Sequence, residues 1–127
     1  MAFKLTTRIL GDVTIIDLSG RLEIGEGSVI LRETLQNNPA DAKVLINLTD
    51  VSFLDTSGLG ELVSAHTRAQ NAGTHLKLTG IPSRVEKLFQ MTKLDRILDV
   101  YNNETDALHN WGESPLPPDR LLSETVA

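Results

Sequence analysis

Three consecutive oxygen-bearing side chains, Asp55, Thr56 and Ser57, form the segment where the sequence most strongly indicates chemistry. The next three residues, 58–60, read Gly-Leu-Gly, and the apolar spacing downstream predicts that they form the first turn of a helix. Each glycine there costs about 1 kcal/mol of helix stability relative to alanine, and a helix start needs only one capping side chain. We therefore predict that the Ser57 hydroxyl and its bare backbone surroundings are open to another protein.

Ser57 is also placed where a phosphate would be tolerated. Unpaired N–H groups and the helix dipole favour a negative group at a helix start, whereas Asp55 opposes the added charge. Phosphorylation is thus predicted to change the surface charge without disturbing the fold. The alternative is that Ser57 is only an N-terminal cap, and that the glycines allow the helix to pack closely on a strand.

Other catalytic and ligand-binding patterns are missing from the sequence. There is no cysteine, no Gly-x-Ser-x-Gly elbow and no Gly-x-x-x-x-Gly-Lys-Ser/Thr phosphate loop. Gly58 and Gly60 lack the third glycine of a dinucleotide fingerprint, because Val63 stands at that position. We expect no metal, no bound cofactor and no enzyme activity. The histidines, which lack metal-ligand spacing, are His66, His75 and His109.

Composition narrows the class of protein further. The chain has 127 residues with 12 Lys+Arg against 17 Asp+Glu, a formal charge of −5, and its basic residues are scattered singly. Nucleic-acid binding needs clustered basic residues, so no nucleic-acid partner is expected. The sequence contains no secretory signal and no apolar run of about 18 residues, which favours a cytoplasmic protein with no direct membrane insertion.

Periodicity and turn residues predict the elements that position Ser57. A hairpin turns at Gly11-Asp12, with residues 3, 5 and 9 of its first strand on the buried face, and Ser19-Gly20 ends its second strand. The apolar run 44–48 is predicted to be a strand covered on both faces, which leads through a connection, 49–55, into the helix near Ser57. The expected strands are 3–9, 13–18, 44–48, 76–78 and 97–101.

Helix signals alternate with these strands. The expected helices are 26–37, one from Leu59 to the stop at Gly73, one with Pro82 at its first position, and one capped by Asn103 with Ala107, Leu108 and Trp111 facing inward. The order β-β-α-β-α-β-α-β-α predicts an α/β fold with a small mixed, mostly parallel sheet. We expect a domain at 1–112 and a flexible, proline-containing tail at 113–127.

The run Val-Ser-Phe-Leu-Asp-Thr-Ser-Gly-Leu-Gly at 51–60, preceded by the strand 44–48, resembles the central motif of STAS-domain anti-sigma factor antagonists. The segment 18–23, Leu-Ser-Gly-Arg-Leu-Glu, is similar to the family's exit from its second strand. The resemblance extends over about residues 3–111. It implies a small mixed sheet with helices packed mainly on one face.

The resemblance also implies a role in bacterial partner switching and regulation of transcription. Such proteins bind an anti-sigma factor that is also a serine kinase, and so release a sigma factor; the kinase uses ATP to phosphorylate the antagonist, and a serine phosphatase reverses the step. Ser57 matches the phosphorylated serine. The matching partner-binding positions are Asp55, Thr56, Gly58, Leu59, Gly60 and Glu23, where Glu23 replaces the family's usual Asp; docking is expected to bury Leu59.

Two other classes remain open. STAS modules also serve as cytoplasmic accessory subunits of membrane transporters or as components of stress-signalling complexes, where binding is constitutive. A small nucleotide-binding enzyme is the third possibility, although no set of residues supplies a phosphate cradle, metal ligands and a general base together.

Overall fold

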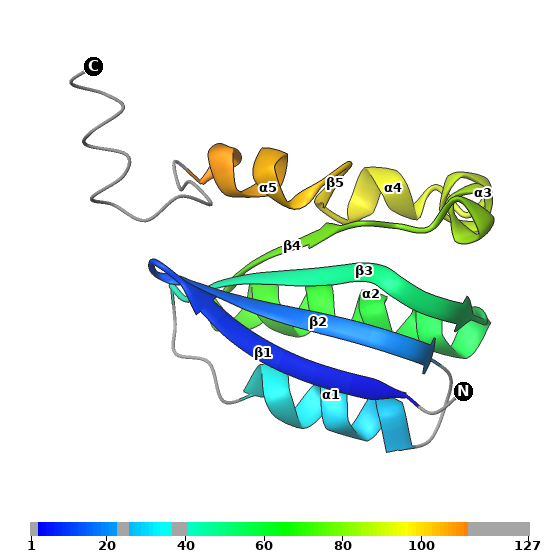
Figure 1. Ribbon diagram of the computed structural model, residues 1–127, viewed down its shortest axis with the longest axis horizontal. Helices are drawn as coiled ribbons and strands as arrows, with labels where there is room; N and C mark the ends of the chain where they lie inside the picture. The colour runs from blue at the N-terminus through cyan, green and yellow to red at the C-terminus, as the bar shows by residue number, and fades with distance from the viewer. Residues whose placement is uncertain (1–2, 23–25, 37–40, 112–127) are drawn as a thin grey trace.

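Residues 3–22, 26–36 and 41–111 are described in the computed structural model, and their strands form one five-stranded sheet (Figure 1). Strand β1 is antiparallel to β2, and the remaining neighbours in the order β1-β2-β3-β4-β5 pair in parallel. The predicted fold class is confirmed. The strands are β1 Lys4–Leu10, β2 Val13–Leu22, β3 Lys43–Leu54, β4 His75–Thr79 and β5 Val100–Tyr101; the helices are α1 Glu26–Gln36, α2 Thr56–Ala72, α3 Ser83–Met91, α4 Leu94–Ile97 and α5 Glu104–Asn110.

The β1–β2 hairpin turns at Gly11 as predicted, but two details of its strands differ. Strand β2 does not end at Ser19-Gly20: Gly20 adopts a φ of 85° at an irregularity in the pairing with β3, and the strand continues to Leu22. A glycine in this conformation bends a strand without ending it. Ile9 is 76% exposed, so the prediction that it faces the core is wrong.

Strand β3 is longer than its apolar run. Residues 49–54, predicted as a connection, extend the strand to Leu54 because they pair in parallel with the second half of β2, where Asp50 lies beside Ser19 and Leu54 beside Leu22. Thr49 and Asp50 are exposed, which is why the local sequence resembles a loop. Hydrogen bonding to the neighbouring strand therefore decided the structure of this segment.

The last third of the chain departs from prediction at two points. Pro82 precedes α3 as its N-cap, with ψ of 145°, and is not its first helical residue. Ile97 ends the short helix α4, so that only Val100 and Tyr101 form the last strand. Asn103 caps α5 as predicted, because its Oδ1 accepts a hydrogen bond from the Asp106 N–H at 2.9 Å.

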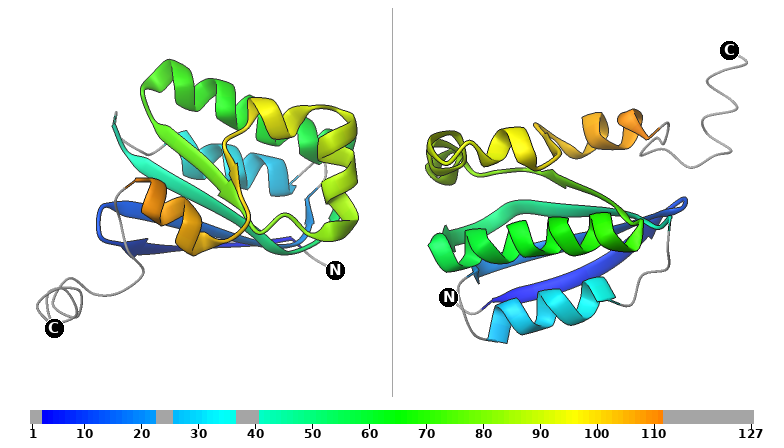
Figure 2. Two further views of the ribbon diagram at one scale, coloured as in Figure 1. Left: turned by 90° about the horizontal axis from the view of Figure 1, so that it is seen from above. Right: turned by 180° about the vertical axis from the view of Figure 1, so that it is seen from behind.

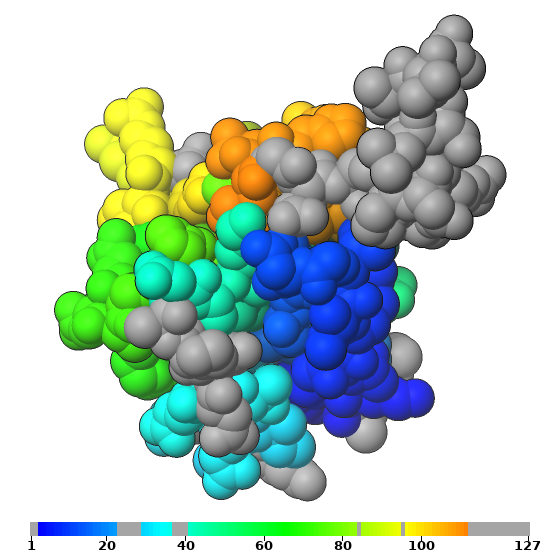
Figure 3. Space-filling model, turned by 90° about the vertical axis from the view of Figure 1, so that its left-hand side faces the viewer, coloured from blue at the N-terminus to red at the C-terminus, as the bar shows by residue number. Residues whose placement is uncertain are grey.

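Apolar side chains pack on both faces of the sheet. Helices α1, α2 and α3 contribute to a large cluster on one face, and α5 contributes Ala107 and Leu108 to a smaller one. The apolar run at the start of β3 is covered on both faces of the sheet, as predicted. Val44 and Ile46 lie in the large cluster and Leu45 lies in the small one. Figure 2 shows α5 (orange) across the sheet from α1 and α2, and Figure 3 shows the hairpin (blue) between α5 and α1 (cyan). The helices thus lie mainly on one face.

Candidate functional site

Helix α2 begins directly after β3, and Asp55 at the junction caps it. Asp55 has extended backbone, and its Oδ1 accepts a hydrogen bond from the Gly58 N–H at 2.8 Å. The next two residues, Thr56 and Ser57, are exposed. Because Asp55 provides the cap, the alternative that Ser57 serves only as the N-terminal cap is wrong.

The two glycines of this turn have different surroundings. A Cβ on Gly58 would lie 2.1 Å from the Leu22 backbone oxygen, so Gly58 permits the close packing of α2 on the end of β2. A Cβ on Gly60 would meet nothing within 4 Å, and Gly60 is exposed. The packing alternative is therefore correct for Gly58, whereas packing gives no reason for glycine at position 60.

Leu59 belongs to the core. Its side chain is 5% exposed and lies in the large apolar cluster. The expectation that a docking partner buries this side chain is therefore wrong, because the fold already buries it. The surface of the turn consists of Thr56, Ser57 and Gly60, and the predicted site residue Glu23 lies outside the described residues, as do 113–127.

A charged group that the sequence analysis missed lies one turn beyond Ser57. Glu61 on α2 is 8% exposed, and its two carboxylate oxygens accept hydrogen bonds from Arg32 Nη2 of α1 at 3.3 Å and from Arg68 Nη2 at 3.2 Å. A glutamate is rarely buried without a partner. The feature of the sequence that could have revealed Glu61 was an acidic residue among the apolar residues that begin this helix. The Arg32–Glu61 ion pair joins α1 to α2 beside the exposed turn, and the Arg68–Glu61 pair lies within α2.

Arg21 lies beside the strand residues that lead into the site. Its guanidinium carbon is 3.9 Å from the centre of the Phe53 ring, and the two residues are partners in the β2–β3 pairing. Phe53 is half-buried, two residues before the cap at Asp55. A positive charge is thus held over an aromatic face near the entrance to α2.

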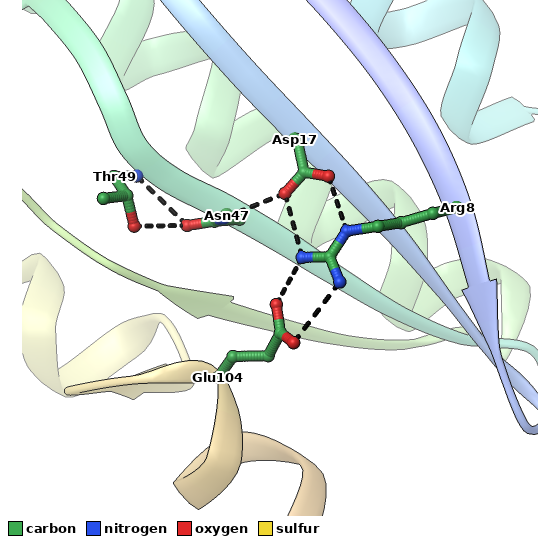
Figure 4. Close-up of polar contacts among 5 residues, drawn as sticks. All are labelled: Arg8, Asp17, Asn47, Thr49 and Glu104. Atoms are coloured by element: carbon green, nitrogen blue, oxygen red, sulfur yellow. Dashed lines mark hydrogen bonds and ion pairs between the residues drawn. The ribbon is translucent and has the colours of Figure 1, made fainter. Parts of the chain in front are cut away.

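A second polar cluster, also missed, lies on the face covered by α5. Arg8 donates from Nε to Asp17 Oδ2 at 2.7 Å and also pairs with Glu104, and Asn47 Nδ2 donates to Asp17 Oδ1 at 2.8 Å (Figure 4). Thr49 Oγ1 donates to Asn47 Oδ1 at 2.6 Å. The hydrogen bond from Arg8 lowers the pKa of Asp17, and the bonds to Asp17 and Glu104 raise the pKa of Arg8. The cluster joins β1, β2 and β3 to the first turn of α5.

Lys77 forms a further contact between β4 and α5. Its ammonium, on a residue 5% exposed, donates to Asp99 Oδ2 at 2.6 Å, to the Tyr101 hydroxyl at 3.0 Å and to Asn110 Oδ1 at 2.8 Å. Burial acts to lower the pKa of Lys77, but the bonds to Asp99 and Tyr101 outweigh it and leave the pKa raised. The ammonium also lies 4.9 Å from the centre of the Trp111 ring.

Among residues 3–22, 26–36 and 41–111, no three His, Cys, Asp or Glu side chains are grouped so that they could hold a metal ion. Nor does any helix in these ranges have the length and apolar character needed to cross a membrane.

Comparison with known families assigns the domain. The family model described as STAS domain matches residues 4–107. The chain belongs to the STAS-domain family. The relatives of this STAS protein include the anti-sigma-B factor antagonist of Bacillus subtilis, 28% identical over 85 residues, which cover 67% of this chain and 78% of that protein. The anti-sigma F factor antagonist of Paenibacillus polymyxa is 26% identical over 99 residues, covering 76% and 84% of the two chains.

Solved structures share the fold of this STAS protein at lower sequence identity. The phosphorylated form of the Bacillus cell fate determinant SpoIIAA superposes with a TM-score of 0.61 at 20% identity, over 86% of this chain and 98% of that one. A sulfate transporter family protein from Wolinella succinogenes gives 0.69 at 20% identity, over 81% and 87%. At this identity the likeness concerns the fold alone, and the fold is shared between proteins of two different roles.

Proposed function

We propose that this STAS protein is an anti-sigma factor antagonist, and that phosphorylation of Ser57 switches it off. The observation that carries the proposal is the exposed Ser57 on a turn already capped by Asp55, beside Gly60, whose position requires no glycine for packing. The names of the Bacillus subtilis and Paenibacillus polymyxa relatives support the general function.

The proposed partner is an anti-sigma factor that is also a serine kinase, and binding to it releases a sigma factor. The exposed turn of Thr56, Ser57 and Gly60 offers a hydroxyl and uncovered backbone as the contact surface. Asp55 and the backbone of Gly58 and Leu59 hold that turn in place, and Glu23 extends the contact. Because the side chain of Leu59 is buried, its proposed contribution is through the backbone.

Phosphorylation ends the contact by adding charge. The Ser57 Oγ attacks the γ-phosphorus of ATP held by the kinase; the new O–P bond forms as the bond to ADP breaks, and a base on the kinase takes the hydroxyl proton. The product carries about −1.5 to −2 charge beside Asp55, and repulsion and desolvation then oppose docking. A serine phosphatase removes the phosphate by hydrolysis. The antagonist itself needs no cofactor, because the kinase binds the ATP.

The decisive experiment is phosphorylation by the candidate kinase with ATP, followed by mass-spectrometric mapping. The wild-type protein should carry one phosphate on Ser57, and Ser57→Ala should not be labelled. Equal labelling of Ser57→Ala and wild type would overturn the proposal. Binding to the kinase should also be weaker for Ser57→Asp than for Ser57→Ala, because only the first places a negative charge on the contact surface.

The second candidate is a cytoplasmic accessory role in a membrane transporter or stress-signalling complex. The observation in favour of this second candidate is the fold that the chain shares with the Wolinella succinogenes sulfate transporter family protein. A pull-down distinguishes the two: recovery of a transporter ATPase would favour the accessory role, and recovery of a sigma-regulating kinase would favour the antagonist.

A further inference from the structure

Three charged or modifiable residues of α2 lie along one stripe of the helix. Glu61 follows Ser57 by four residues and Arg68 follows Glu61 by seven. Residues at i and i+4 are surface neighbours, with about 5–6 Å between their Cβ atoms, and seven residues are close to two full turns. The buried carboxylate of Glu61 is therefore the neighbour of Ser57 on the next turn, and Arg68 holds it from the far side.

Arg32 reaches this stripe from the neighbouring helix. Helices α1 and α2 start at the same end of the sheet (Figures 1 and 2). Because helical side chains lean toward the helix N-terminus, the Glu61 carboxylate leans toward the turn that carries Ser57, and Arg32 meets it there. Its guanidinium is 3.3 Å from Glu61 Oε2, and its side chain is 45% exposed, so it is held by Glu61 yet open to a further acceptor.

We propose that Arg32 binds the phosphate on Ser57, leaving Glu61 to Arg68; the inference rests on the proposed function in taking Ser57 as the modified residue. A phosphate dianion accepts bidentate hydrogen bonds from a guanidinium and attracts it more strongly than a single carboxylate does. The exchange does not leave a buried charge unpaired, because Glu61 keeps its bond to Arg68 at 3.2 Å.

The transfer of Arg32 lets the phosphate change the contact between α1 and α2 as well as the charge of its own turn. Like charges at i and i+4 repel each other, so a phosphate beside Glu61 needs a cation between them. Arg32 is the cation on the partner helix, and its transfer replaces the ion pair between α1 and α2 with one between α1 and the phosphate. The described charged groups around the phosphate are Asp55 before it, Glu61 on α2, Arg32 on α1, and Arg21 near the entrance to α2; Arg68 lies farther along α2 and holds Glu61.

The test uses the full chain with phosphoserine placed at position 57 during translation, which needs no kinase. Phosphorus NMR then follows the second pKa of the phosphate, ordinarily about 6. Arg32→Gln should raise this pKa by about half a unit or more, because a nearby cation favours the dianion. The matched control is Arg68→Gln, which also removes one bond from Glu61 but lies about 16 Å along the helix from Ser57; it should leave the pKa near its starting value.

A third variant guards against an indirect effect of losing the side chain. Arg32→Lys keeps a cation on the same turn and should recover at least half of the shift seen with Arg32→Gln. The inference is overturned if Arg32→Gln leaves the phosphate pKa unchanged, or if Arg68→Gln raises it equally. Failure of the kinase to label Ser57 would instead count against the proposed function, while the titration would still give its answer.

Discussion

On the face of the sheet covered by α5, the Arg8 side chain pairs with Asp17 and Glu104 and so holds α5 on the strands. At the start of α2, by contrast, Thr56 and Ser57 lie exposed on a capped turn. Lys77 resembles the Arg8 cluster, because its three hydrogen bonds are all made within the fold. The contrast teaches that polar residues satisfied within the fold stabilise it, and that an exposed hydroxyl beside bare backbone is available to a partner. Four predictions test this division, from the largest expected effect to the smallest.

The two glycines of the exposed turn should respond in opposite ways to alanine. Gly58→Ala places a Cβ against the Leu22 backbone oxygen and should lower the free energy of unfolding by about 2–3 kcal/mol. Gly60→Ala has open space and should raise it by up to about 1 kcal/mol through helix propensity. Urea denaturation of both variants measures the difference.

The affinity for the proposed kinase partner tests whether Gly60 contributes to binding, in addition to its effect on stability. If the bare backbone there is part of the contact, Gly60→Ala should weaken binding to the kinase although the fold is as stable as wild type or more so. Unchanged affinity would remove Gly60 from the proposed surface, and a loss of stability would contradict the open surroundings of this residue.

Removing Asp99 should destabilise the contact between β4 and α5. Asp99→Ala takes away the carboxylate that neutralises the buried Lys77 ammonium, and should cost about 2 kcal/mol in urea denaturation. Adding Lys77→Met should recover part of the loss, because the unpaired charge is then gone. Thr56→Ala at the exposed turn is the contrast and should stay within about 0.5 kcal/mol of wild type. An equal loss in Thr56→Ala would contradict the division between the regions.

The Arg8–Asp17 pair should make a small, pH-dependent contribution. Since the pKa of Asp17 is lowered in the folded protein, its contribution is present above the ordinary aspartate pKa of about 3.9 and is lost as the pH falls through the lower folded value. Asp17→Asn should therefore be less stable than wild type by less than about 1 kcal/mol at pH 7, and the difference should shrink as the pH is lowered below 4. Urea midpoints at pH 7 and pH 3 provide the comparison; a difference that persists unchanged at pH 3 would show that Asp17 acts by something other than its charge.

Local patterns were enough to predict the elements whose residues carry their own signals. The apolar run at 44–48, Gly73 after α2 and Asn103 before α5 each depend on neighbouring residues, and each is confirmed. Segments whose structure depends on a distant strand were predicted wrongly. Residues 49–54 are strand because they pair with the end of β2, and Ile9 is exposed although the apolar spacing placed it on the buried face with residues 3 and 5.

The same division holds at the candidate site. The sequence by itself determined the helix start at 55–57 and the STAS family, and it supplied Ser57 as the proposed phosphorylation site, because these depend on residue types at short spacing. Only the tertiary structure decided that Gly58 packs on Leu22, that Leu59 is buried, and that Arg32 meets Glu61. These are contacts between elements distant in the sequence, and their geometry is set by how α1, α2 and the sheet pack together.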